Sequence, residues 1–225
     1  MTGAVKSVNA QQGTFTPPDR GSPPVTAGGA SRSNCVVGPM SIAGLIPASG
    51  EGRTVEASPA LFVYVPKTSA TEAEFVLKDE EENDIARMTL PLPSQAGIVK
   101  VNLSESEAMP DLEVGQDYHW YLAAICNPQN RLDDVFAEGW LQRTSASATL
   151  PNPGEISPSL AAVDRYLEAN LWHDALAALV ELRQSNPNDT TVTAKWEEVL
   201  SEAGLDSIAE APLVFEKEIA AKNAK

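Results

Sequence analysis

The chain has 225 residues, of which 43% are hydrophobic, and carries a formal net charge of −15 with a pI near 4.5. This length suits one medium domain with an extension or two small domains, and the hydrophobic content is enough for a core. Binding of phosphate backbones needs several Lys or Arg side chains on one face, and the sequence has no basic cluster. It also has no apolar run long enough to cross a bilayer. We therefore expect neither nucleic acid nor anionic lipid as a partner, and no insertion into a membrane.

Residues 1–34 are rich in Gly, Pro, Ser and Thr and have few large apolar side chains. Such a segment cannot bury enough surface to offset chain entropy, so we expect a disordered tail. The start lacks the apolar region of a complete signal peptide, but Val8-Asn9-Ala10 before Gln11 has the form of a small-residue cleavage site. These features predict a shortened N-terminus.

Residues 35–149 have the pattern of an all-β domain. Short runs rich in β-branched and aromatic residues are separated by Pro, Gly, Asn and Ser. In "GIVKVNL", Val99 and Val101 alternate with Lys100 and Asn102, which predicts a strand with one buried face and one solvent-exposed face. Seven or eight such strands predict an antiparallel β-sandwich.

Residues 155–215 change to helical periodicity. Ser157-Pro158 predicts a helix start, "SNPND" ends a second helix, and Gly204 ends a third over about 190–203. The predicted helical core consists of Tyr166, Trp172, Ala175, Leu179 and Trp196. We expect a helical hairpin with a capping helix, packed on the sandwich or on a partner, with His173 on the exposed face. Residues 216–225 form a charged tail.

Two local resemblances accompany these patterns. "LEVGQDYHWYL" resembles the corner before strand F of fibronectin type III and immunoglobulin-like sandwiches, with Leu112, Gly115, Tyr118 and Trp120 at the matching positions. The resemblance implies that the tyrosine hydroxyl bonds back to the turn. The spacing of Tyr166, Trp172, Ala175, Leu179 and Pro187 resembles one tetratricopeptide unit, although Val163 and Leu182 replace small residues of that pattern.

His119 is the histidine nearest to a cysteine in the β domain. In a strand whose register places Tyr118 and Trp120 on one face, His119 points to the opposite face. We interpret it as a surface histidine, and we expect no catalytic residues. A hydrolase that uses His119 or His173 with a carboxylate remains the minor alternative.

Cys35 and Cys126 are the two cysteines, and neither belongs to a C-x-x-C pair, which argues against metal and redox motifs. A disulfide between them is the favoured interpretation. By closing a long loop it would stabilise the fold by roughly 4–5 kcal/mol in the chain-entropy model. Two unpaired buried thiols, or a chemical role, remain the alternatives.

Two polar loops invite a ligand hypothesis. "DEEEND", from Asp79 to Asp84, lacks the alternating oxygens and the glycine of a calcium loop, so we expect a charged hairpin tip. In "NPQNRLDDVFAEGW", Arg131, Asp133 and Asp134 are the candidate binding residues, because binding residues concentrate on loops of rigid scaffolds. These three side chains could instead pair with one another.

The ordered series "FTPPDRGSP", the Cys35 strand, "FVYVP", "AEFVL", "GIVKVNL", "YHWYLAAICNPQNR" and "LWHDALAALVELR" resembles one cyanobacterial family. This family is catalogued as a domain of unknown function, number nine-twenty-eight. The resemblance implies export, since members typically begin with an export signal. It implies no activity, substrate or catalytic residue.

These observations together predict a non-enzymatic interaction module of the cell envelope or exported space. We expect a protein partner, no cofactor and no metal, and a periplasmic or secreted location, with the cytoplasm as the alternative. The second hypothesis is carbohydrate binding through exposed rings of Trp120, Tyr121 and Trp140. Against it, at least two of these rings could belong to the core.

Overall fold

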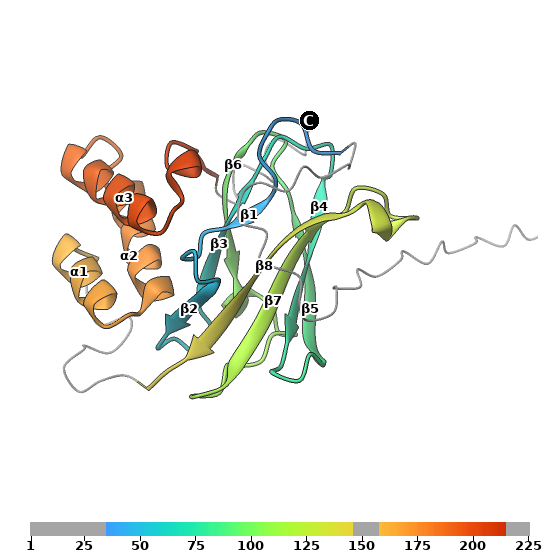
Figure 1. The fold of residues 1–225 in the computed structure, drawn as a ribbon, viewed down its shortest axis with the longest axis horizontal. Helices are drawn as coiled ribbons and strands as arrows, with labels where there is room; N and C mark the ends of the chain where they lie inside the picture. The colour runs from blue at the N-terminus through green and yellow to red at the C-terminus, as the bar shows by residue number, and fades with distance from the viewer. Residues whose placement is uncertain (1–34, 146–157, 215–225) are drawn as a thin grey trace, which may run out of the picture.

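The computed structural model describes residues 35–145 and 158–214. The predicted tails at 1–34 and 216–225 lie outside these ranges, as does most of the segment that joins the β and helical parts. Two β-sheets pack face to face, and three helices lie against one side of the pair (Figure 1). The predicted class, a β-sandwich followed by helices, is confirmed.

The smaller sheet has the strand order β1-β3-β6-β9 and the larger has the order β2-β8-β7-β4-β5. The strands of the smaller sheet are β1 (Ala43–Gly44), β3 (Ala60–Val65), β6 (Gly97–Asn102) and β9 (Leu213–Val214). Those of the larger sheet are β2 (Glu51–Thr54), β4 (Glu72–Lys78), β5 (Asp84–Pro91), β7 (Asp117–Ala124) and β8 (Val135–Arg143). The short 3₁₀ helices are η1 (Leu103–Glu105), η2 (Arg131–Asp133) and η3 (Asp206–Ile208).

The prediction of purely antiparallel pairing is wrong at two places. β2 pairs with β8 in parallel, and β9 pairs with β6 in parallel. The first parallel pair arises because the chain leaves β1, which pairs with β3, and crosses to the edge of the other sheet. The second arises because β9 returns to the smaller sheet after the helices, and a repeated pattern of local hairpins contains no signal for such a return.

The core between the sheets follows the alternation read from the sequence. Val99 and Val101 of β6 face Phe75 and Leu77 of β4 within one buried cluster. Trp120 at the centre of this cluster is fully buried, with its ring stacked 6.3 Å from that of Phe75. A Cβ atom at Gly139 would lie 2.9 Å from the Trp120 ring, so glycine is needed where β8 passes the indole.

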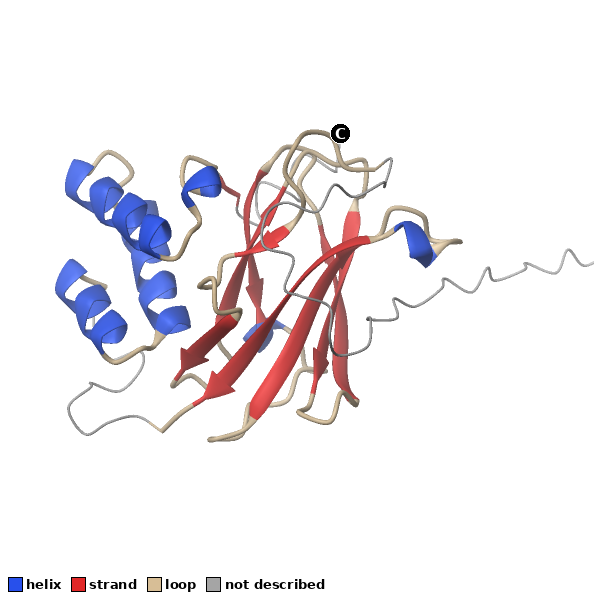
Figure 2. Cartoon of the chain, viewed as in Figure 1, coloured by secondary structure: helices blue, strands red, loops and turns tan. Residues whose placement is uncertain are grey.

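The helices are α1 (Leu160–Glu168), α2 (Trp172–Ser185) and α3 (Thr190–Glu202) (Figure 2). The helix start predicted at Ser157-Pro158 is placed too early, because the Ser159 side chain accepts a hydrogen bond from Ala162 N and caps α1. Asp189 caps α3 in the same way. Gly204 has a φ of 77° after α3, as expected for a left-handed helix stop.

The helices pack on the outer face of the smaller sheet. Leu45, Phe62, Tyr64 and Ile98 from the sandwich share one buried cluster with apolar side chains of all three helices. The indole Nε1 of Trp172 donates a hydrogen bond of 2.8 Å to the carbonyl of Leu45. Because β9 then joins β6, the helical segment is tied to the sandwich both at the start of α2 and after α3. No helix of residues 35–145 and 158–214 is long and apolar enough to cross a membrane.

Candidate functional site

The corner residues lie together at the start of β7. The Tyr118 hydroxyl accepts a hydrogen bond of 2.8 Å from the backbone N–H of Glu113. Gly115 has a φ of 86°, and its N–H donates to the Arg143 carbonyl at 2.7 Å. Leu112 is buried and its carbonyl accepts from the Arg143 guanidinium at 2.6 Å. These contacts give the corner a structural role, and Trp120 has a place in the core.

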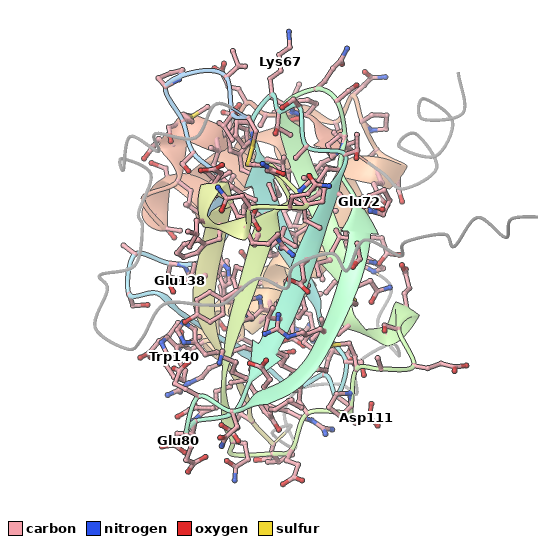
Figure 3. All side chains as sticks on the ribbon, turned by 90° about the vertical axis from the view of Figure 1, so that its right-hand side faces the viewer. Lys67, Glu72, Glu80, Asp111, Glu138 and Trp140 are labelled. Carbon is pink, nitrogen blue, oxygen red and sulfur yellow. A yellow bond between two sulfur atoms is a disulfide. The ribbon has the colours of Figure 1, made fainter. Side chains whose placement is uncertain are left out.

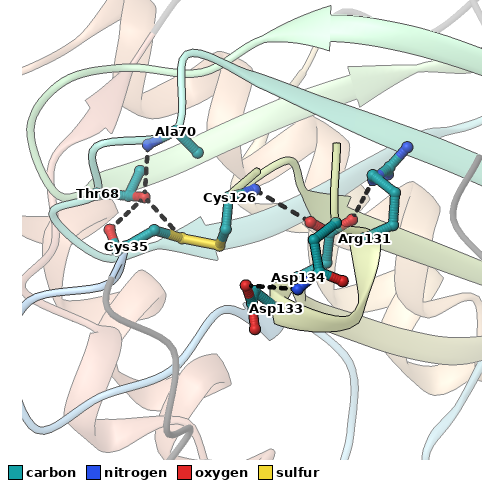
Figure 4. Close-up of a disulfide and its surroundings, with 8 residues drawn as sticks. Cys35, Thr68, Ala70, Cys126, Arg131, Asp133 and Asp134 are labelled. Atoms are coloured by element: carbon teal, nitrogen blue, oxygen red, sulfur yellow. Dashed lines mark hydrogen bonds and ion pairs between the residues drawn. A yellow bond between two sulfur atoms is a disulfide. The ribbon is translucent and has the colours of Figure 1, made fainter. Parts of the chain in front are cut away.

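The predicted disulfide is confirmed, with Cys35 and Cys126 bonded and their Cα atoms 5.4 Å apart (Figure 4). The Thr68 hydroxyl donates to the Cys35 carbonyl at 2.8 Å, and Val37 N donates to the Lys67 carbonyl. We call this region the disulfide end, which comprises Cys35–Val37, Lys67–Ser69 and residues 126–134. It joins three segments that are far apart in the sequence.

The loop from β7 to β8 is held by an internal ionic network at the disulfide end. The Asp134 side chain has no exposed surface, accepts from Cys126 N at 3.0 Å, and pairs with Arg131 Nε at 2.6 Å. Arg131 also reaches Glu74 of β4 at 3.1 Å. Burial raises the pKa of Asp134, although Arg131 and the Cys126 N–H oppose that shift. Asp133 accepts a hydrogen bond from the Asn130 side-chain amide at 3.0 Å. Of the two alternatives left by the sequence, the structure places Arg131 and Asp134 in a pair with each other.

The side chain that this network presents to solvent is Leu132, which is 94% exposed. It belongs to η2, the turn that projects from the sandwich on the right of Figure 2. Val37, two residues from Cys35, is the next most exposed large apolar side chain at 62%. The two most exposed large apolar side chains of the described residues therefore both lie at the disulfide end.

The prediction of His119 as a surface histidine is correct for its face and wrong for its exposure. His119 lies on the outer face of the larger sheet, yet it is only 6% exposed. Its ring stacks on Trp140 with 4.3 Å between centroids, because these two residues are direct cross-strand partners. Nδ1 lies 2.9 Å from Glu82 Oε1 and 3.1 Å from the Tyr121 hydroxyl. Glu138, which Figure 3 shows beside Trp140 on β8, lies 3.6 Å from Nε2.

The rings considered for carbohydrate binding differ in accessibility. Trp120 and Tyr121 are buried, Trp120 in the core and Tyr121 in a small cluster with Val76 and Ala123 on the outer face. Trp140 is partly exposed and stacks on His119. The described residues therefore offer no pair of fully exposed rings among these three.

The predicted helical core residues are all buried in one cluster: Tyr166, Trp172, Ala175, Leu179 and Trp196. The Trp196 indole donates to the Ala209 carbonyl at 2.8 Å, and the Arg183 guanidinium lies 4.4 Å from the centroid of its ring. The prediction of an exposed His173 is wrong, since this residue is only 2% exposed. The first turn of α2 is covered on several sides, and the His173 ring lies directly against Gly52 of β2.

A cavity of about 240 Å³ lies between the sandwich and helices α1 and α2. Its polar lining consists of Thr54, Glu56, Tyr166, His173, Asp174 and Glu181. Asp174 Oδ2 accepts from Val55 N at 3.3 Å, and burial raises the pKa of Asp174 to about 7. Burial lowers the pKa of His173 to about 3, so the ring is neutral at physiological pH. Among the described residues, no group of three or more His, Cys, Asp or Glu side chains is arranged to hold a metal ion.

The comparisons with known proteins identify the family. A family model described as Domain of Unknown Function (DUF928) matches residues 27–213. The chain belongs to this family. No curated protein matches this DUF928 chain. One similar solved structure is the fn3 domain of the human collagen alpha-1(XX) chain, at 11% identity and a TM-score of 0.28. That likeness covers 57% of the DUF928 chain and 100% of the collagen domain.

Sequence reasoning did not single out Leu132 or Asp174. Leu132 was recognisable as the lone large apolar residue in the polar stretch from Asn127 to Asp134. Asp174 gave no such signal, because an acidic residue in the first turn of a helix is ordinarily a solvated partner of the helix dipole. Its burial results from the sandwich packing against α2, which helical periodicity does not report.

Proposed function

We propose that the protein is a non-enzymatic interaction module that binds a protein partner at the disulfide end. The observation that carries this proposal is the pre-organised display of Leu132. The Cys35–Cys126 bond and the Asp134 contacts hold the loop, while the Leu132 side chain is 94% exposed. A rigid loop loses little conformational entropy on binding, so its exposed apolar side chain is well suited to anchor a partner.

We also propose that this module works in the cell envelope or exported space of a cyanobacterium. The disulfide supports an oxidising compartment, because cytosolic thiols are ordinarily kept reduced. The resemblance of the chain to an exported cyanobacterial family points the same way. The helical hairpin, which we interpret as one tetratricopeptide-like unit, would serve mainly to cover the smaller sheet.

The test compares three immobilised full-length proteins in an envelope extract of the source cells: wild type, Leu132→Ser and Val114→Ser. Val114 is 55% exposed and lies beside the Tyr118 corner, so it controls for loss of an exposed apolar side chain elsewhere. We expect one defined protein to be retained by wild type and Val114→Ser and to be lost with Leu132→Ser. Equal retention by all three proteins, or retention of polysaccharide alone, would contradict the proposal.

A further inference from the structure

The cavity between the sandwich and the helices has the composition of a binding site for a small molecule. Ala and Pro side chains make up the apolar part of its lining, and the polar side chains named above come from the sandwich, α1 and α2. Binding pockets for drug-sized ligands measure about 300–1,000 Å³, so a cavity of about 240 Å³ suits a ligand with few non-hydrogen atoms. Convergent polar groups beside apolar walls are typical of ligand sites.

His173 supplies an observation that points to a ligand. Its side chain lines the cavity, and among the described residues neither ring nitrogen has a hydrogen-bond partner. A neutral imidazole has one acceptor nitrogen and one N–H donor, and leaving such a group buried without a partner is energetically costly. A ligand that hydrogen-bonds to the ring within the cavity would recover part of this cost.

The charge of the lining selects the class of ligand. Asp174, Glu56 and Glu181 contribute three carboxyl groups, and the lining contains no Lys or Arg among the described residues. Arg143 lies outside the lining and favours the ionised form of Glu56, but burial outweighs it and raises the pKa of Glu56. Thr54, Tyr166 and neutral His173 can all accept hydrogen bonds. A ligand with several N–H donors and a positive charge fits this set, whereas an anion would meet three carboxyl groups.

We propose that the cavity binds a small organic monocation, a primary ammonium or guanidinium group on a short alkyl chain. The cationic group would lie at Asp174, within reach of His173, and the alkyl chain would contact the Ala and Pro side chains. This site is separate from the disulfide end, so the proposal does not depend on the identity of the protein partner.

The test is an NMR titration of the ¹⁵N-labelled full-length protein with n-butylammonium and n-butylguanidinium chloride. n-Butanol and sodium butanoate serve as neutral and anionic ligands of similar size. We expect a saturable shift of the Val55 amide, which donates to Asp174, with either cation. Butanol and butanoate are expected to bind at least about tenfold more weakly, a difference of about 1.4 kcal/mol.

Variants locate the site within the cavity. Asp174→Asn keeps an acceptor for Val55 N and removes the ionisable carboxyl group. At pH 8, where Asp174 with its pKa of about 7 is mostly ionised, this variant is expected to weaken n-butylammonium at least about tenfold. Glu202→Gln, at an exposed position of α3, should leave binding unchanged. If Asp174→Asn does not fold, the double variant Glu56→Gln/Glu181→Gln, at the less buried carboxyls, should show the same selective loss of cation binding.

Three results would overturn the proposal. The first is the absence of any saturable shift with either cation in the folded wild-type protein. The second is equal affinity for n-butanol and n-butylammonium, which would make the cavity a neutral apolar pocket. The third is n-butylammonium binding that survives both Asp174→Asn and the double variant.

Discussion

The indole Nε1 of Trp172 donates its hydrogen bond to the Leu45 carbonyl across 127 residues of sequence. The two residues join α2 to the segment that follows β1, and both belong to the buried cluster between the helices and the smaller sheet. With β9 paired to β6, this contact makes the helices part of the folding unit of the sandwich.

Trp172→Ala is therefore expected to destabilise the whole protein. Truncation of a large buried aromatic side chain costs about 3–5 kcal/mol, and Trp172→Phe, which keeps a ring in place, should cost less. Urea unfolding followed by far-ultraviolet circular dichroism and by tryptophan fluorescence measures both variants. One shared transition at lower urea is the expected result. Two separate transitions, with the β signal unchanged, would show that the helices and the sandwich unfold independently.

The Tyr118 corner makes a narrower prediction. Tyr118→Phe removes the acceptor of the Glu113 N–H and should lower the free energy of unfolding by about 1–3 kcal/mol. The matched variant is Tyr64→Phe, whose hydroxyl makes no hydrogen bond to the residues that the structure describes. Tyr64→Phe should change stability much less in the same urea experiment. Equal losses would mean that the Tyr118 hydrogen bond contributes nothing specific.

Removal of the disulfide tests both stability and the rigidity of the loop. Cys35→Ser/Cys126→Ser should lose roughly 4–5 kcal/mol in the chain-entropy model, because the bond closes a 91-residue separation. The same variant should speed amide hydrogen exchange at 127–134, since Cys126 anchors one end of this loop. Unchanged exchange there would show that the Asp134 network holds the loop without the bond.

The pH dependence of stability follows from two neighbours on α2. The pKa of Asp174 is about 7 in the folded protein, against 3.8 normally. The contribution of Asp174 to the free energy of unfolding is therefore fully present below about pH 4 and is lost as the pH rises to 7. The pKa of His173 is about 3 against 6.5 normally. Its contribution is therefore complete above pH 6.5 and is lost as pH falls towards 3. Between pH 4 and 6.5 the two effects oppose each other.

Asp174→Asn removes the first effect and should leave a free energy of unfolding that rises more steeply from pH 4 to 6.5. Glu56, whose pKa is also raised by burial, acts in the same direction as Asp174 and remains in this variant. Urea midpoints measured from pH 3 to 8 check the slope, with Glu202→Gln as the control expected to match wild type. A profile for Asp174→Asn that overlays wild type would contradict the assigned pKa of Asp174.

Local pattern accounts for much of the fold. Alternation along β6 placed Val99 and Val101 correctly in the core, since side-chain direction in a strand has a period of two. The Tyr118 corner also followed from a short motif, and the disulfide was favoured because the chain has two cysteines and neither is in a C-x-x-C pair. The parallel pairing of β9 could not be predicted in this way, because it depends on where the packed helices place the chain that follows α3.

The two histidines show why the site was harder to predict than the fold. The alternation of side chains along a strand predicted the face of the sheet on which His119 lies. Its burial comes from Trp140 on the neighbouring strand and from Glu82 in a turn. Helical periodicity placed His173 away from the Trp172 stripe, yet β2 covers that side of α2 as well. Both errors concern contacts between distant segments, which periodicity within one element does not encode.

The most direct test of the central claim is photocrosslinking in the source cells from a photoreactive residue at position 132. The account predicts one discrete crosslinked protein from position 132 and none from position 114, which lies away from the disulfide end. Both proteins should fold as wild type does, since both positions are exposed. A crosslink from position 114 but not from 132, or the same products from both, would contradict the claim that the disulfide end binds the partner.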